Sequence, residues 1–197
     1  MIILGITGGI GSGKSYVSTL LREQLNVPVY DCDTEAKRLM NEDETIQWRL
    51  KELVGAHVYK NGKLQKSILA NYLFSDQHHA QKVNAIVHPV VKDDFRKWAE
   101  RQKSDVVAIE SAILYESGFD SMVDKILLVD APKELRLQRV MQRDSSTRQQ
   151  IEVRINMQRP EGQRQKADYV IENEGIQQES LLLALQGILK NINLIRQ

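Results

Sequence analysis

The sequence predicts an α/β fold in which a five-stranded parallel sheet is covered by helices on both faces. Five apolar runs of strand length recur along the 197 residues, at 2–7, 27–30, 105–110, 125–130 and 168–171. Stretches with helical periodicity separate these runs, which favours parallel β-α-β units with helices on both sides of the sheet. A glycine-rich turn directly follows the first run, where a strand gives way to a helix.

The glycine-rich turn has the residues and the setting of a phosphate-binding loop. Residues 8–15 read Gly-Gly-Ile-Gly-Ser-Gly-Lys-Ser, between the first strand and a helix predicted from Lys14 to about Leu25. Glycines allow consecutive N–H groups to converge on phosphate oxygens, and the helix N-terminus adds partial positive charge. A turn without a ligand would not need Lys-Ser at this offset. The residues predicted to hold a nucleoside triphosphate are Gly8, Gly9, Gly11, Ser12, Gly13, Lys14, Ser15 and Tyr16.

Two residues at the end of this loop have separate expected roles. Lys14 is expected to reach the β- and γ-phosphates, and the Ser15 hydroxyl is expected to coordinate Mg²⁺. The loop therefore predicts nucleotide binding, a property that kinases share with switch proteins and nucleotide sensors.

Composition and charge narrow the class of protein. Hydrophobic residues make up 42% and charged residues 27%, which is ordinary for a soluble globular chain. The net charge of +1 provides no field for nucleic acid or an anionic membrane, and no apolar stretch approaches the ~20 residues of a membrane span. The single cysteine, Cys32, excludes an internal disulfide, and because the sequence opens directly in its predicted first strand we expect no signal or transit peptide. We predict a cytoplasmic protein without nucleic-acid or membrane partners, either a monomer or a small homo-oligomer.

About 75 residues separate the second and third predicted strands, too many for a loop. Their pattern is helical over 35–40, 45–53, 67–74 and about 77–102. Pro89 falls inside the last stretch, directly after His88, and is expected to break or kink that helix. We interpret the segment as a helical insertion that forms a substrate-binding part.

Residues 136–166 are the most basic part of the chain. They hold eight basic and three acidic side chains, a local charge of +5 where the whole chain has +1. Arg136, Arg139 and Arg143 fall at i, i+3 and i+7, which places them on one helical face. A solvated basic face is one interpretation, and nucleic-acid binding is another, although the stretch has no aromatic residue to stack a base. We favour a lid that closes over transferring phosphates.

Together these observations predict one unit over 1–197 with three parts. The core covers 1–32, 104–135 and 167–197, the helical acceptor-binding insertion covers about 33–103, and the lid covers about 136–166.

Carboxylates follow two of the predicted strands. Asp31 and Asp33 come after the second strand and Glu110 ends the third, so they are expected to face the phosphate loop, because ligands bind at the carboxyl ends of parallel strands. One of the aspartates is a candidate to accept the proton of an attacking hydroxyl, and all three are candidates to hold Mg²⁺ through water. Alternatively, Asp33 caps the helix that starts at Thr34, and Glu110 is a surface acid.

The motifs, taken in order, resemble the dephospho-CoA kinase family. They are Ile6–Ser15, Asp31-Cys32-Asp33, Val87-His88-Pro89, Arg139, Arg143-Asp144, Gln158, Ala167-Asp168-Tyr169 and Asn173. The resemblance covers nearly the whole chain and implies a P-loop nucleoside-triphosphate hydrolase fold of the nucleotide-kinase-like type, with a helical CoA domain and an arginine lid. It also implies phosphorylation of the ribose 3′-hydroxyl of dephospho-coenzyme A by ATP with Mg²⁺, the last step of coenzyme A synthesis.

The resemblance assigns roles to individual residues. Asp33 becomes the base for the 3′-hydroxyl, Lys14 and the lid arginines Arg139 and Arg143 serve the phosphates, and Lys66 and His88 lie on the acceptor side. Four positions depart from the family pattern, namely Tyr16 for Thr, Lys66 for Arg, Ala112 for Pro and Arg136 for Gln.

Other functions fit the loop alone. A nucleoside monophosphate or shikimate-type kinase shares the loop and the lid but does not account for the later motifs. A GTPase switch requires an Asn-Lys-x-Asp motif, which the sequence lacks. A nucleotide sensor that catalyses no reaction would not require Asp33 or the arginines of the predicted lid.

Overall fold

The computed structural model describes residues 1–76, 78–144, 147–157, 161–175 and 177–194. The chain divides into two compact units. The first unit combines Met1–Tyr30 with Gln102–Gln197, and the second is Asp31–Arg101, which covers most of the segment predicted as a helical insertion.

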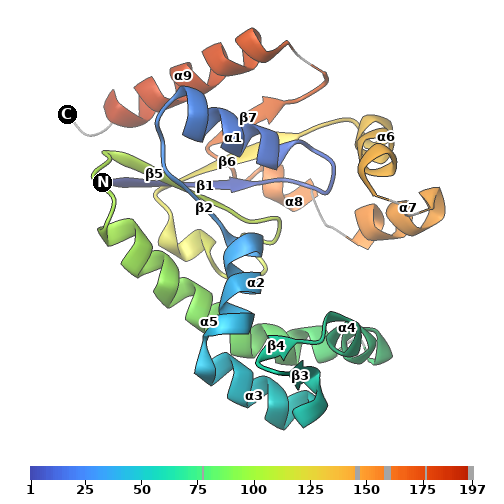
Figure 1. The fold of residues 1–197 in the computed structure, drawn as a ribbon. Helices are drawn as coiled ribbons and strands as arrows, with labels where there is room; N and C mark the ends of the chain where they lie inside the picture. Colours follow the sequence, from blue (N-terminus) through green and yellow to red (C-terminus); the bar gives the residue numbers. More distant parts are fainter. Residues whose placement is uncertain (77, 145–146, 158–160, 176, 195–197) are drawn as a thin grey trace. The chain divides into compact units, whose positions relative to one another are not determined.

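The first unit is built on a five-stranded parallel sheet, as predicted (Figure 1). Its spatial order is β2-β5-β1-β6-β7, so the first strand of the chain is central. In register, Ile2 of β1 pairs with Val106 of β5, and Leu4 pairs with Lys125 of β6. The loop that leaves the carboxyl end of β1 therefore lies between the ends of β5 and β6. The strands are β1 (Ile2–Thr7), β2 (Val29–Asp31), β5 (Val106–Glu110), β6 (Lys125–Asp130) and β7 (Tyr169–Glu172).

Helices α1 and α9 lie together over one face of this sheet (Figure 1). Their apolar faces, with Leu20 and Leu21 on α1 and Leu181 and Leu185 on α9, join the side chains of the strands in one buried cluster. On the sheet, Gly5 leaves room for Leu114 and Val123, which both lie within 3.3 Å of where a β-carbon would be. The helices of this unit are α1 (Lys14–Gln24), α6 (Lys133–Arg143), α7 (Arg148–Met157), α8 (Glu161–Arg164) and α9 (Gln178–Leu194).

The second unit is helical, with one short hairpin. Strands β3 (Tyr59–Lys60) and β4 (Lys63–Leu64) pair antiparallel across Asn61-Gly62, and both turn residues have positive φ. Asn-Gly is the preferred pair for such a two-residue turn, although the sequence analysis did not predict a hairpin here. The helices are α2 (Cys32–Glu42), α3 (Glu44–Val54), α4 (Lys66–Ser75) and α5 (His79–Glu100).

The break predicted as one outcome at Pro89 does not occur, because α5 continues through Pro89 to Glu100, and the kink predicted as the other outcome stays a prediction. A proline inside a helix removes the hydrogen bond to the carbonyl four residues earlier, here that of Ala85. Ala85 and Pro89 are both exposed, so water can reach this carbonyl. The opposite face buries Val83, Val87, Val91 and Phe95 at helical spacing, and this packing outweighs the lost bond.

No helix in the described part of the chain is both long enough and apolar enough to cross a membrane.

Candidate active site

The phosphate loop joins β1 to α1 and leaves the start of α1 open to an anion. Gly13 is the N-cap of α1 with φ of 100°, a conformation that favours glycine, and it supplies no side-chain cap. The first turn of α1 also contains no acidic residue. Gly13 therefore offers no side-chain acceptor to the N–H groups of this turn, and their partial positive charge can be directed at a phosphate.

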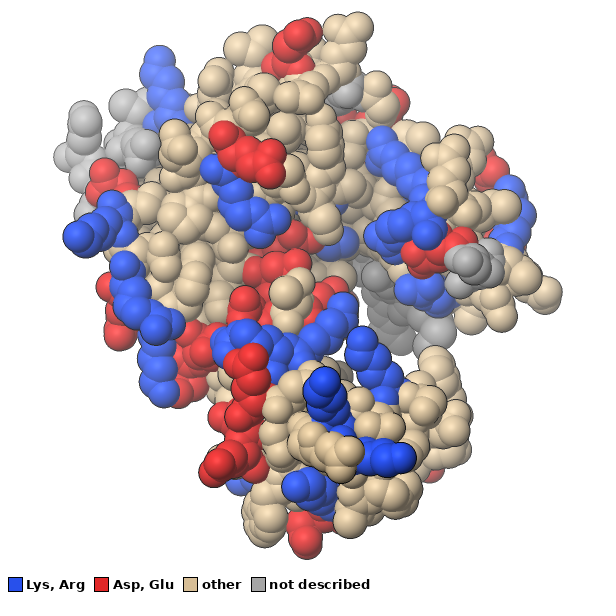
Figure 2. All heavy atoms as spheres, in the orientation of Figure 1, with Lys and Arg blue, Asp and Glu red and all other residues tan. Residues whose placement is uncertain are grey.

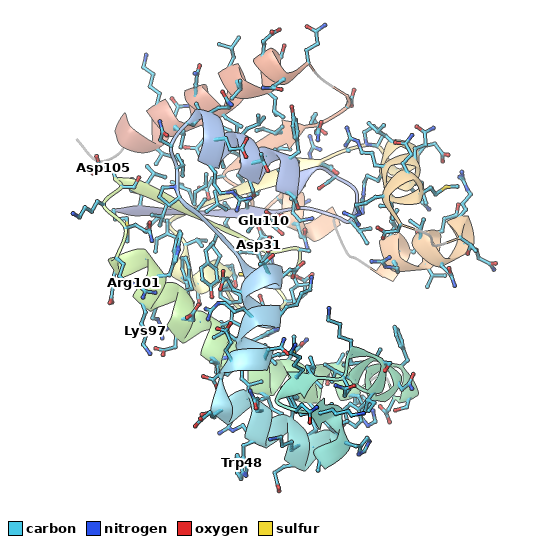
Figure 3. The ribbon with its side chains drawn as sticks, viewed as in Figure 1. Asp31, Trp48, Lys97, Arg101, Asp105 and Glu110 are labelled. Atoms are coloured by element: carbon cyan, nitrogen blue, oxygen red, sulfur yellow. The ribbon has the colours of Figure 1, made fainter. Side chains whose placement is uncertain are left out.

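Lys14 and Ser15 are held by two neighbouring groups. Lys14 Nζ donates to the carbonyl of Gly9 at 3.2 Å, within the loop itself. Ser15 Oγ donates to Glu110 Oε1 at 2.9 Å. Glu110 ends β5 and is only 6% exposed, so its interpretation as a surface acid is wrong (Figure 3).

Among the described residues, four buried side-chain oxygens have no hydrogen-bond partner, and three of them belong to the phosphate loop and its neighbouring strand ends, whereas the fourth is Ser18 Oγ on α1. The three atoms are Glu110 Oε2, Thr7 Oγ1 and Ser12 Oγ. A buried carboxylate oxygen left without a partner costs free energy, which indicates that the site binds something.

The donor set beside Ser15 fits Mg²⁺. Hydroxyl and carboxylate oxygens are its preferred ligands, and in phosphate sites it keeps several waters and takes few protein ligands. No cluster of three or more His, Cys, Asp or Glu residues suited to a metal exists in the part of the chain that the structure describes. Ser15 and Glu110 therefore suit a metal that arrives with a nucleotide, and they do not form a metal cage of their own.

The three arginines of α6 have different environments, although the spacing predicted one shared face. Arg136 is 4% exposed and donates from Nε to the carbonyl of Ile10 at 2.8 Å. Arg139 is partly buried and donates to the carbonyl of Ser12 at 3.3 Å. Arg143 is exposed and pairs with Asp144 at 2.8 Å. The first two therefore contact the phosphate loop, whereas Arg143 contacts its neighbour in sequence.

Asn173 is a loop contact whose role the sequence analysis missed. It follows β7, is 5% exposed, and donates from Nδ2 to the carbonyl of Ser12 at 2.9 Å. Its own carbonyl accepts from Arg139 at 3.0 Å, and its N–H donates to the carbonyl of Asp130. The available signal was its position at the carboxyl end of a parallel strand, where ligand sites form.

Much of the charge of the basic segment is balanced within the first unit. Arg148 pairs with Glu134 and Glu152, and Arg164 pairs with Asp130 and Glu172. In Figure 2, basic and acidic side chains lie among one another over the visible face. Gln158, one of the motif residues, lies outside the described residues.

In the second unit, Asp31 and not Asp33 is the N-cap of α2 (Figure 3). Asp31 Oδ1 accepts from the N–H groups of Asp33 and Thr34 at 3.0 and 3.1 Å. The interpretation of Asp33 as the cap is therefore wrong. The Asp33 side chain lies exposed in the first turn, and its carboxylate makes no hydrogen bond or ion pair with another described residue.

The other two acceptor-side candidates lie on separate helices of the second unit. Lys66 is exposed at the start of α4, and His88 is half-buried on α5. Burial, helped by the nearby charge of Lys92, lowers the pKa of His88, so its ring is neutral at pH 7. Their relation to the phosphate loop of the first unit stays a prediction.

A phosphate loop at the carboxyl end of the central parallel strand, with a buried carboxylate on its serine, defines a nucleotide-binding protein of the P-loop kinase fold. Comparison with solved structures agrees, since the shikimate kinase from Bacteroides thetaiotaomicron has the same fold, with a TM-score of 0.56 and 18% identity over 96% of this chain and 98% of that one. The chain matches the crystal structure of TT1252 from Thermus thermophilus with a TM-score of 0.81 and 36% identity, covering 96% of this chain and 97% of that one.

Sequence comparison identifies the family. A family model described as dephospho-CoA kinase matches residues 2–179. The dephospho-CoA kinase of Bacteroides fragilis (strain YCH46) is 48% identical over 176 residues, which are 88% of this chain and 85% of that protein. The dephospho-CoA kinase of Porphyromonas gingivalis (strain ATCC BAA-308 / W83) is 45% identical over 85% of this chain and 82% of that protein. The chain belongs to the dephospho-CoA kinase family, and it is a kinase.

Proposed function

We propose that the chain transfers the γ-phosphoryl group of ATP to the ribose 3′-hydroxyl of dephospho-coenzyme A, forming coenzyme A and ADP in the last step of coenzyme A synthesis. Membership of the family is the observation that supports dephospho-coenzyme A as the acceptor. The phosphate loop, with its open helix N-terminus and its held lysine, supports ATP as the donor.

On the donor side, the N–H groups of the loop and of the first turn of α1 bind the phosphate oxygens. Lys14, which donates to the carbonyl of Gly9 at 3.2 Å, reaches the β- and γ-phosphates when the nucleotide is bound. Ser15 and Glu110 would hold Mg²⁺, which supplies positive charge to the same oxygens when it is bound. Asp31 and Asp33 are further candidates to hold its water shell.

On the acceptor side, Asp33 accepts the proton of the 3′-hydroxyl as its oxygen attacks the γ-phosphorus. The bond from that phosphorus to the oxygen bridging to the β-phosphate breaks, and ADP leaves. The exposed and unpaired carboxylate of Asp33 supports this assignment, since a capping aspartate would already be engaged. Arg139 and Arg143 balance charge on the transferring group, and Lys66 and His88 bind the acceptor.

The acceptor is tested by offering ATP with dephospho-CoA, AMP, CMP or shikimate and following ADP release. We expect dephospho-CoA to give the highest kcat/KM, with a product phosphorylated on the 3′-oxygen by phosphorus NMR. A reaction without acceptor and the Lys14→Ala variant correct for background hydrolysis. Preference for AMP, CMP or shikimate would replace this proposal with another P-loop kinase, and ADP release that no acceptor stimulates would indicate a nucleotide hydrolase or switch.

We also propose the cytoplasm as the setting of the reaction. The single cysteine, Cys32, is buried and forms no disulfide, which suits a reducing compartment. The working form is a monomer or a small homo-oligomer, which a sedimentation measurement distinguishes.

A further inference from the structure

Helix α6 lies directly against the back of the phosphate loop (Figure 1). The Ile10 side chain packs into an apolar cluster formed by α6 and α7, which consists of Leu137, Val140, Ile151 and Ile155. A β-carbon placed on Gly11 would meet the Arg136 carbonyl and the Val140 side chain. The start of the predicted lid is therefore packed on the loop.

Arg136 is the deepest cationic group in this contact. Its side chain is nearly inaccessible, its Nε donates to the carbonyl of Ile10, and its guanidinium covers the α-carbon of Gly9. Burial lowers the pKa of Arg136, while the charge of Asp130 opposes that shift, and an arginine still remains protonated. Burying a cation is costly, and a neutral side chain of similar volume would fill the space more cheaply.

The position of Arg136 connects it to the lysine of the loop. The Gly9 carbonyl accepts from Lys14 Nζ, whereas the Gly9 α-carbon lies against the guanidinium. The next carbonyl, that of Ile10, accepts from Arg136. With the carbonyl of Ile10 bound to α6, the loop backbone is held where its N–H groups remain available to phosphate.

We propose that Arg136 is a positioning residue for the triphosphate of ATP. It acts through residues 9–11 of the loop, which its guanidinium holds in a phosphate-ready shape, and its buried charge adds to the positive field of that loop. The proposal rests on ATP as the donor in the proposed function, and it is independent of which acceptor is used.

The same contact accounts for glycine at position 9. The φ of Gly9 is not positive, so alanine can adopt its backbone conformation. The three atoms closest to a β-carbon at Gly9 all belong to the Arg136 guanidinium, all inside 3.0 Å. Because that guanidinium is buried and bonded to Ile10, it cannot swing away as an exposed arginine would. The nearest obstacle to an alanine at position 9 is therefore the Arg136 guanidinium.

The first test measures ATP and ADP binding by calorimetry, without any acceptor, in Arg136→Met, Arg136→Gln and Arg136→Lys. We expect Arg136→Met to weaken ATP binding about tenfold, Arg136→Lys to restore part of the loss, and Arg136→Gln to fall between them because it keeps a donor but no charge. In turnover, KM for ATP rises while KM for the acceptor stays within about twofold, since the loop contacts only the donor.

Arg22→Met is the charge-matched control, because Arg22 is exposed in the last turn of α1, at the end of the helix away from the loop. Unchanged ATP affinity in a folded Arg136→Met protein would overturn the proposal, and so would an equal loss in Arg22→Met. If Arg136→Met does not fold, the ATP affinity of Arg136→Gln is used in its place, and an unchanged affinity there would overturn the proposal. Glutamine is suited to this test because it is the residue usual in the family.

The second test is a double-mutant cycle between Gly9→Ala and Arg136→Ala. We expect Gly9→Ala to weaken ATP binding about tenfold with Arg136 present and less than about threefold in the Arg136→Ala background. An equal loss of ATP affinity in both backgrounds would show that the contact between Gly9 and Arg136 does not determine the shape of the loop. Because ATP binding is measured alone, failure of dephospho-CoA as acceptor leaves both tests readable, and a failed test leaves the acceptor assignment standing.

Discussion

The buried residues around the phosphate loop and the residues assigned to the acceptor differ in how firmly the fold holds them. In the first unit, Ser12, Glu110, Arg136 and Asn173 are each at most 6% exposed and surround the phosphate loop. In the second unit, Asp33 and Lys66 are exposed on different helices, and only His88 is half-buried.

The difference follows from the chemistry that each side performs. Phosphates are bound largely by backbone N–H groups, which act only if the loop has a fixed shape, so its carbonyls are bonded from behind by Arg136, Arg139 and Asn173. Proton transfer requires a single carboxylate that is open to the substrate. We therefore propose that the donor site is organised before ATP binds and that the acceptor residues gain their partners from the substrate.

The largest expected effect tests the acceptor side. Asp33→Asn is expected to lower kcat by about 10²–10⁴-fold, the range for a lost general base, while ATP binding stays unchanged. Steady-state kinetics measure kcat, and an ATP titration measures ATP binding. Asp93→Asn, an exposed acid of the same unit that pairs with Lys97, is the matched control. Near-normal turnover of Asp33→Asn would remove the base assignment.

The next effect tests the donor side. Lys14→Ala is expected to lower kcat/KM for ATP by about 10²–10³-fold, because the positive charge on the transferring phosphate is lost. In contrast to Asp33→Asn, nucleotide affinity also falls, which an ATP titration detects. Lys190→Ala, an exposed lysine of α9, is the control. If Lys14→Ala bound ATP normally and kept its turnover, Lys14 would have no role in binding the phosphates of ATP. The proposed difference between the donor side and the acceptor side would then be lost.

Glu110→Gln tests the buried carboxylate beside Ser15. It keeps the size of the side chain but removes the charge that suits Mg²⁺, so we expect the Mg²⁺ concentration for half-maximal activity to rise about tenfold. A Mg²⁺ titration at fixed ATP measures this shift, and thermal unfolding checks that the fold is intact. An unchanged Mg²⁺ requirement would limit Glu110 to holding the Ser15 hydroxyl.

The smallest effect concerns the frame of the first unit. Asp168 accepts from Lys125 Nζ at 2.8 Å and from the Ile126 N–H at 2.9 Å, which ties the start of β7 to β6. Burial alone would raise the pKa of Asp168, but these two donors outweigh it and the pKa lies below its ordinary value. Asp168→Asn is expected to cost about 1 kcal/mol of unfolding free energy at pH 7, a modest value because solvent screens the pair.

The pH dependence of this effect has a defined sign. Because the folded pKa of Asp168 is lowered, its stabilisation is complete above the unfolded pKa of about 4 and is lost as pH falls through the folded pKa. Denaturant unfolding at pH 7 and pH 3 should therefore show a smaller difference between wild type and Asp168→Asn at pH 3. An equal difference at both values would indicate that the charge is not involved.

The sequence by itself determined the sheet, the phosphate loop and the family. Buried parallel strands require continuous apolar runs, and a phosphate cradle requires glycines and Lys-Ser at fixed offsets, so both leave local signals. The order of the later motifs then indicated dephospho-CoA kinase, which the comparisons confirmed.

Only the tertiary structure decided which polar residues are buried and what they hold. Spacing put Arg136, Arg139 and Arg143 on one face, but packing of α6 on the loop buried the first and left the last in solvent. Such outcomes depend on contacts between segments far apart in sequence, and periodicity within one segment carries no information about them.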